Sequence, residues 1–141
     1  MDWNSVGTTH LIRFDPGEEL VAELTRWSKE HSLSGGTVEG LGGVCEVELG
    51  YFDQDRKEYH RWMNPGNWEL VHLWGNLTFR NGERFWHLHA TISGKNGQCR
   101  GGHLFSAQIA VTAELVVRPW KKAIVRSRDE ITGLDLWNLS K

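Results

Sequence analysis

Residues 87–104 read HLHATISGKNGQCRGGHL, and they hold three of the seven histidines of the chain. Extended sequence stands on both sides of a turn-forming run at 94–97, which is the pattern of a β-hairpin. Asn96 lies midway between His89 and His103, so strands that pair about this turn bring the two histidines opposite one another. The turn therefore folds the third histidine back onto the first two.

The three histidines form a candidate metal site. His87 and His89 project from one face of the strand, about 6–7 Å apart along it, while Leu88 points the other way, into the core. Three imidazoles with an open fourth position form the ligand set of catalytic zinc; imidazole also suits nickel, copper and iron. The spacing alone supports a shared site and three unrelated polar residues equally. Water, a carboxylate, Cys99 or a ligand from elsewhere would take the fourth position, and water is preferred to the closed site that Cys99 would make.

A strand and a helix are expected before this hairpin. The segment 8–14 alternates polar and apolar residues, as a strand does. Asp15 is a favourable N-cap, Pro16 suits the first helical position, and Glu18 completes a capping-box-like pair. The helix is expected to end near His31. Its core face is expected to carry Leu20, Leu24 and Trp27.

Glycine and turn residues divide the rest of the chain. Five glycines break the first part of 35–53 into short pieces before a strand at 44–52, and they permit close approach of a ligand or another subunit. A turn is expected at 64–66, and Asn81-Gly82 is a strong hairpin signal. With one main helix, a second short helical piece and six to eight strands, these patterns predict an α+β fold with a mostly antiparallel sheet. We expect one domain over 1–141.

The composition narrows the function. A formal net charge of -2 gives little electrostatic attraction for DNA, because non-specific affinity comes from neutralising phosphates. The basic residues between 118 and 128 are expected to form a solvated face. The N-terminus has no signal-peptide pattern and no stretch is long and apolar enough to cross a membrane, so a cytoplasmic protein with reduced cysteines is expected. Eight tryptophans favour a core, a pocket wall or a subunit interface.

The sequence resembles the plants-and-prokaryotes-conserved (PPC) domain from about residue 10 to residue 136. The resemblance rests on FDPGEEL, EGLGGV, LGYFD, GNWELVHLWGN, HLHATISGKNGQCRGGHL and TAELVV, in this order. It implies the same α+β fold and a homotrimer. It also implies a metal site, usually taken as zinc, with His87, His89 and His103 as ligands. The family is similar in fold to acetolactate decarboxylase, a zinc enzyme whose metal is held by three histidines.

The resemblance also implies two interactions. Single-domain prokaryotic members are described as DNA-binding proteins, but this sequence lacks the basic AT-hook segments that accompany the plant domain. The plant domain contacts partner proteins through a Gly-Arg-Phe-Glu-Ile-Leu motif. The matching positions here form a candidate partner-binding segment: Gly66, Asn67, Trp68, Glu69, Leu70 and Val71. Asn67 stands where the motif has its arginine.

Three functions follow as hypotheses. The first is a trimeric metal-binding protein with a regulatory role. The second is a small zinc-dependent lyase or hydrolase acting on a small-molecule ligand, with Glu69 as the candidate general base. The third is direct DNA binding. No nucleotide-binding, hydrolase or CxxC motif is present to favour another class of enzyme.

Overall fold

The computed structural model describes residues 1–139, which form one α-helix and eight β-strands. In chain order the elements are β1 (Asp2–Val6), β2 (Thr9–Phe14), α1 (Leu20–Glu30), β3 (Gly36–Asp53), β4 (Glu58–Arg80), β5 (Glu83–Ser93), β6 (Cys99–Pro119), β7 (Val125–Arg128) and β8 (Asp135–Asn138). Every strand pairing is antiparallel except that of β4 with β7. The predicted α+β class and mostly antiparallel sheet are confirmed, whereas the second short helical piece is not found among residues 1–139.

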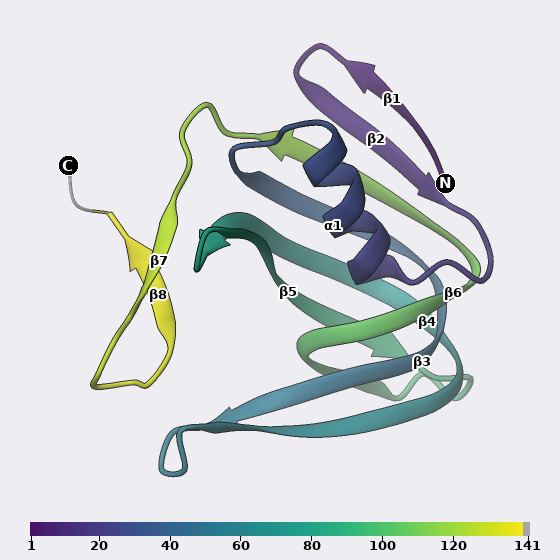
Figure 1. Cartoon of the computed structure of the whole chain (residues 1–141). Coiled ribbons are helices and arrows are strands. Elements are labelled where there is room, and N and C mark those ends of the chain that lie inside the picture. The colour runs from purple at the N-terminus through teal and green to yellow at the C-terminus, as the bar shows by residue number, and fades with distance from the viewer. Residues whose placement is uncertain (140–141) are drawn as a thin grey trace.

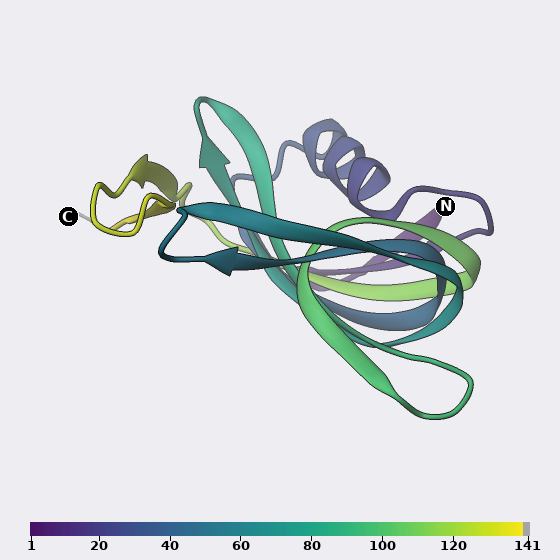
Figure 2. The ribbon, with the colours of Figure 1, turned by 90° about the horizontal axis from the view of Figure 1, so that it is seen from below.

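Four long strands close the sheet on itself. β3 pairs with β4 and β6, and β5 pairs with the same two strands, so β3, β4, β5 and β6 form a ring. The β1–β2 hairpin extends this ring at β6, and the β7–β8 hairpin extends it at β4 and lies to one side of the molecule (Figure 1). Seen from below, β7 and β8 stand apart from the curved strands (Figure 2).

Helix α1 packs over β5 and β6 and buries the face that the sequence predicts (Figure 1). The side chains of Leu20, Leu24 and Trp27 are 0–1% exposed. Together with the inward side chains of the ring strands they form one hydrophobic core. Burial of these large apolar groups is the main force that holds the helix on the sheet.

The predicted start of the helix at Pro16 is wrong. The helix begins at Leu20, and the Glu19 side chain caps it by accepting from the backbone N–H groups of the first turn. The preceding segment pairs with β6 instead, because Gly17 N–H donates to the Ile109 carbonyl at 2.8 Å and Ile109 N–H donates to the Glu18 carbonyl at 2.9 Å. Glu18 does accept from the Asp15 N–H, at 2.9 Å, within a turn that comes before the helix.

The glycine-rich segment does not break into short pieces. It lies inside the continuous strand β3, whose register shifts at bulges. A Cβ at Gly40 would lie 2.5 Å from the Glu114 carbonyl oxygen, and one at Gly42 would lie 2.3 Å from that of Thr112. Strand β6 of the same chain therefore makes one close approach that these glycines permit. The expected approach of a ligand or a second subunit stays a prediction.

The expected turn at 64–66 is also wrong, because β4 runs through it. Gly66 has a positive φ of 77° and donates to the Glu46 side chain at 2.9 Å, opposite a register shift in β3. The residues that the sequence suggests as a chain-reversing turn therefore form a β-bulge within the strand. The hairpin at Asn81-Gly82 is confirmed: both residues have positive φ, as a type I′ turn requires.

A substitution at Gly75 tests how tightly β4 packs against β5, the strand that carries His87 and His89. It pairs with Leu88, and a Cβ there would lie 2.2 Å from the His87 carbonyl oxygen. We expect Gly75→Ala to lower the free energy of unfolding by about 1–3 kcal/mol, measured by urea denaturation, because the strands must separate to fit the methyl group. The control is Gly101→Ala, whose nearest atom would be at 3.2 Å, and it should cost less. Equal losses would contradict this account.

Candidate metal centre

The β5–β6 hairpin brings the three predicted histidines together. His89 on β5 lies directly opposite His103 on β6, and His87 lies two residues before His89 on the same face. On its other side His103 pairs with Gly50 of β3. Leu88, between the two β5 histidines, points into the core and is 0% exposed, as predicted.

The ring nitrogens lie close enough for one ion. The Nε2 atoms of His87 and His89 are 3.2 Å apart. One ligand nitrogen from each of the three histidines lies within 4.8 Å of the others. Two nitrogens on a tetrahedral zinc, each at ~2.0–2.1 Å, stand about 3.3 Å apart, so the first pair already has the spacing of two ligands. Their assignment as ligands stays a prediction.

The surroundings keep the three imidazoles neutral. Burial lowers the pKa of His87 to about 4, with the charges of Arg126 and His89 adding to the effect. Burial likewise lowers the pKa of His103 to about 3, with contributions from the other two histidines and from nearby arginines, and lowers the pKa of His89. Metal binding requires the neutral imidazole, so these donors are ready for an ion at neutral pH.

An unsatisfied nitrogen also fits a bound ion. His103 is 8% exposed, and its Nδ1 atom is buried without a hydrogen-bond partner among residues 1–139. A buried polar nitrogen without a partner destabilises the fold by roughly 1–3 kcal/mol. A cluster of neutral donors with an unsatisfied member therefore suits a metal ion better than it suits an internal hydrogen-bond network.

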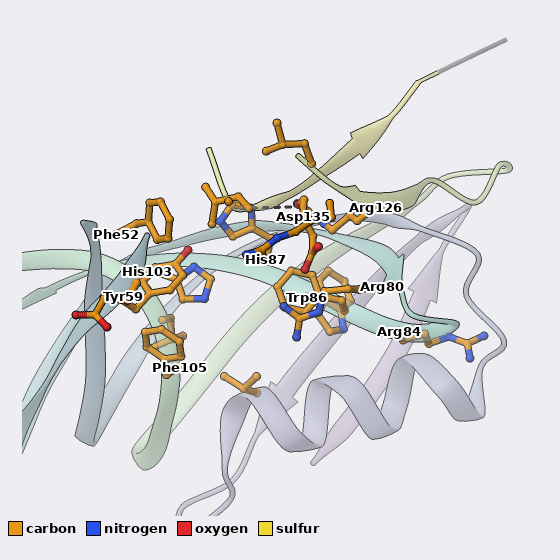
Figure 3. Close-up of a pocket in the computed structure, with 18 of the residues that line it drawn as sticks. Phe52, Tyr59, Arg80, Arg84, Trp86, His87, His103, Phe105, Arg126 and Asp135 are labelled. Atoms are coloured by element: carbon orange, nitrogen blue, oxygen red, sulfur yellow. Dashed lines mark hydrogen bonds between the residues drawn. The ribbon is translucent and has the colours of Figure 1, made fainter. Parts of the chain in front are cut away.

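A cavity of about 450 Å³ opens beside His87 and His103 (Figure 3). Aromatic rings form one wall: the ring centre of Phe105 lies 4.6 Å from that of His103, and the ring centre of Tyr59 lies 5.0 Å from it. Arg126 forms another wall, and Figure 3 marks its contact with His87 Nδ1, at 3.4 Å. The histidines thus face a space large enough for a small molecule.

Two other candidates lie away from the cluster. Glu69 is exposed and pairs with Ser93, four residues along β5 from His89, which is ~13 Å at the usual strand rise. Cys99 is also exposed and lies four residues from His103, again ~13 Å along the strand. Neither joins the histidine group or lines the cavity. The carboxylates on the cavity wall are Glu58 and Asp135.

The C-terminal hairpin supplies residues that the sequence did not single out. Arg126 was expected on a solvated face, but it is half-buried and donates to Thr78 and Asn76 of β4. This placement depends on the parallel pairing of Phe79 with Val125, which links β4 to β7 across some fifty residues. The alternation of VRSR is too short a signal to reveal it.

The candidate partner-binding segment lies within β4. Trp68 is partly buried against the core, and the Arg100 guanidinium lies 5.0 Å from its ring centre. Glu69 and Val71 are exposed, whereas Leu70 is buried. The segment is therefore a strand with alternating faces, and its role with partners stays a prediction.

The sequence and the fold of the chain are similar to those of known proteins. The Plants and Prokaryotes Conserved (PCC) domain matches residues 1–121. A PPC protein of Pyrococcus horikoshii is 30% identical, with a TM-score of 0.87 over 99% of this chain and 96% of that one. A metal-containing protein of Archaeoglobus fulgidus is 32% identical, with a TM-score of 0.87 over 98% and 99%. A candidate DNA-binding protein of Bacteroides thetaiotaomicron is 26% identical, with a TM-score of 0.93 over 97% and 96%.

The likeness to acetolactate decarboxylase, expected from the sequence, holds for the fold. The enzyme of Bacillus subtilis is 16% identical, with a TM-score of 0.59 over 82% of this chain and 54% of that one. Among curated proteins, none matches. Within residues 1–139, no helix is long and apolar enough to span a membrane. The chain belongs to the plants-and-prokaryotes-conserved domain family.

Proposed function

We propose that this chain is a single-domain, cytoplasmic, homotrimeric metal-binding protein that holds zinc with His87, His89 and His103 and serves a regulatory role. The convergence of three ligand nitrogens within 4.8 Å carries the proposal. The metal-containing relative from Archaeoglobus fulgidus supports a metal in this fold. Zinc is the first choice because it favours imidazole ligands and tetrahedral geometry, and nickel, copper and iron are the alternatives.

Metal content tests the proposal directly. Protein purified without chelator should contain about one zinc per chain by elemental analysis. We expect His89→Ala to bind zinc at least tenfold more weakly than the wild type, because two ligands hold the ion far more weakly than three. The control is His72→Ala, which removes an exposed histidine of β4 outside the group. Unchanged zinc content in His89→Ala would exclude the site.

The lowered pKa values of the histidines predict that zinc binding persists at acidic pH. Protons compete with the metal only as the pH approaches the pKa of each ligand, and for His87 and His103 these lie near 4 and 3. Between pH 7.5 and 5.5 the zinc affinity should fall by no more than about tenfold. A site of three histidines with the ordinary pKa of ~6.5 would lose about a thousandfold in zinc affinity over the same pH range. A competition assay with a chromophoric chelator measures the difference, and the thousandfold loss would contradict the burial argument.

The homotrimer is supported by an exposed apolar groove. Leu11, Leu41 and Val71 are 44%, 56% and 52% exposed and line it together. Side chains of this kind, gathered in one groove, favour burial against another subunit. The groove lies at the pairing of β2, β3 and β6, with Val71 from β4.

Mass in solution tests the trimer. Sedimentation equilibrium should give three times the 16.1 kDa of one chain. Val71→Asp should shift the protein toward monomer, because it would bury an unpaired carboxylate. The control is Ile131→Asp, on a C-terminal turn where the side chain is 86% exposed. A wild-type monomer at micromolar concentration would remove the trimer from the proposal.

DNA binding has less support as a function of this chain. It rests on relatives such as the candidate DNA-binding protein of Bacteroides thetaiotaomicron. The net charge is -2, and Arg126, the most buried member of the C-terminal basic cluster, faces the cavity. Arg118 is paired with Glu39 at 2.7 Å. Lys121, Lys122 and Arg128 remain of the five basic residues between 118 and 128, a small number of groups to neutralise phosphates.

A zinc-dependent lyase or hydrolase is the second candidate. One observation favours it: the cavity of about 450 Å³ opens onto two of the three histidines. Glu58 and Asp135 lie on its lining as carboxylates that can move a proton, a role for which Glu69 is poorly placed because it lies outside the lining. When bound, the metal would polarise a substrate oxygen.

A further inference from the structure

We propose that the cavity beside the histidines binds a small organic carboxylate. Its anionic group would contact Arg126 and Arg80, and its apolar part would lie against the aromatic wall. The inference extends the proposed metal site. The two arginines and the aromatic rings on which it rests are side chains of this chain, and they line the cavity whether or not an ion is bound. The argument rests on charge, hydrogen bonding and the shape of the cavity.

Arg126 and Arg80, two of the four arginines that line the cavity, form no ion pair among residues 1–139. The charge of Asp135, on the same lining, raises the pKa of Arg126 only from a longer distance. Arg126 donates to Thr78 Oγ1 at 2.8 Å, to the Asp135 backbone carbonyl at 2.9 Å and to Asn76 Oδ1 at 3.0 Å, all of them neutral acceptors. Within residues 1–139, no carboxylate oxygen comes within 4.0 Å of Arg126 or Arg80. Arg126 is half-buried, whereas Arg80 is exposed. A partly buried guanidinium group such as that of Arg126 usually sits beside an anion.

The two cations also share one small space. Arg80 and Arg126 place their guanidinium carbons 4.0 Å and 5.2 Å from the ring centre of Phe85. Burial lowers the pKa of Arg126, and the charge of Arg80 adds to this effect. Two like charges near one ring repel each other, and an anion in contact with both would offset that repulsion.

A metal ion on the histidines would add positive charge to the cavity and so favour the binding of an anion. The three ligands are neutral, so a divalent ion would bring two uncompensated positive charges beside Arg126. His87 Nδ1 lies 3.4 Å from the Arg126 guanidinium. If His87 binds metal through Nε2, its proton moves to Nδ1, which then no longer accepts from Arg126. That guanidinium N–H would become available to a ligand.

The cavity also has an apolar wall, which favours an organic anion over a simple inorganic one. The ring centres of Phe52 and Tyr59 are 5.2 Å apart, and those of Tyr59 and Phe105 are also 5.2 Å apart. These rings surround His103 opposite the arginines (Figure 3). The volume of about 450 Å³ lies within the range of ~300–1,000 Å³ for small-molecule sites. Inorganic phosphate would contact the arginines but leave this wall unused.

Calorimetric titration with simple probes tests the proposal. Phenylacetate carries a carboxylate and an apolar ring, phenylacetamide is its neutral match, and inorganic phosphate lacks the ring. We expect phenylacetate to bind at least tenfold more tightly than either of the others, to protein as purified and, more weakly, to chelator-treated protein. Both preparations are used because a chain that holds no metal would defeat the metal site and still report on this cavity.

Substitutions identify the arginines. Arg126→Met should weaken phenylacetate binding about tenfold or more, and Arg80→Met about threefold to tenfold, because each removes a charged donor. Arg126→Met also loses the hydrogen bonds that hold β7 to β4, so Arg80→Met is the second variant: the Arg80 guanidinium contacts the Phe85 ring and makes no hydrogen bond within residues 1–139. Arg118→Met is the control, since Arg118 lies outside the cavity lining and should leave binding unchanged.

Four results would count against the proposal. The first is no heat of binding for phenylacetate in either preparation at millimolar concentration. The second is equal affinity for phenylacetate and phenylacetamide, which would mean that the carboxylate is not recognised. The third is unchanged affinity in both Arg126→Met and Arg80→Met. Phosphate binding more tightly than phenylacetate would replace the organic carboxylate with an inorganic anion and also count against it.

Discussion

The register of the β5–β6 hairpin is the constraint on which the fold and the site both depend. Pairing His89 with His103 sets the two faces of the hairpin, with Leu88 and Ile92 in the core and the histidines on the other side. A shift of one residue would exchange those faces. The same pairing completes the ring of four strands, so loss of this register would open the core and separate the histidines together.

Much of this local order is visible in the sequence. Alternation and the turn at 94–97 predict the hairpin and its histidines because each signal depends only on neighbouring residues. The start of the helix could not be read in this way. Pro16 and Asp15 have the chemistry of a helix start, but the pairing of Gly17 and Glu18 with Ile109, some ninety residues away, overrides that preference.

Long-range pairing also explains what the sequence did not show around the site. The glycines of β3 resemble turn positions, but β4 and β6 pair with this strand on both sides and keep it continuous. At Pro65 and Gly66 of β4, a bulge opposite β3 takes the place of the turn. Arg126 joins the cavity only because β7 pairs with the end of β4. The histidines were predictable from one hairpin, whereas the arginines and rings that surround them depend on the closed sheet.

The electrostatics of the centre follow from this arrangement. Burial keeps the imidazoles neutral, and the adjacent Arg126 adds positive charge without a paired carboxylate. Neutral donors suit a metal cation, and a cation beside unpaired arginines suits an anion. In the proposal, the histidines and the cavity therefore act as one site, which the ring strands and the β7–β8 hairpin build together.

A crystal structure with anomalous scattering measured above and below the zinc edge tests the central claim most directly. The account predicts one strong zinc peak per chain, within about 2.0–2.1 Å of a ring nitrogen of each of His87, His89 and His103. A zinc peak bound elsewhere, or no peak in protein purified without chelator and supplied with zinc, would contradict it.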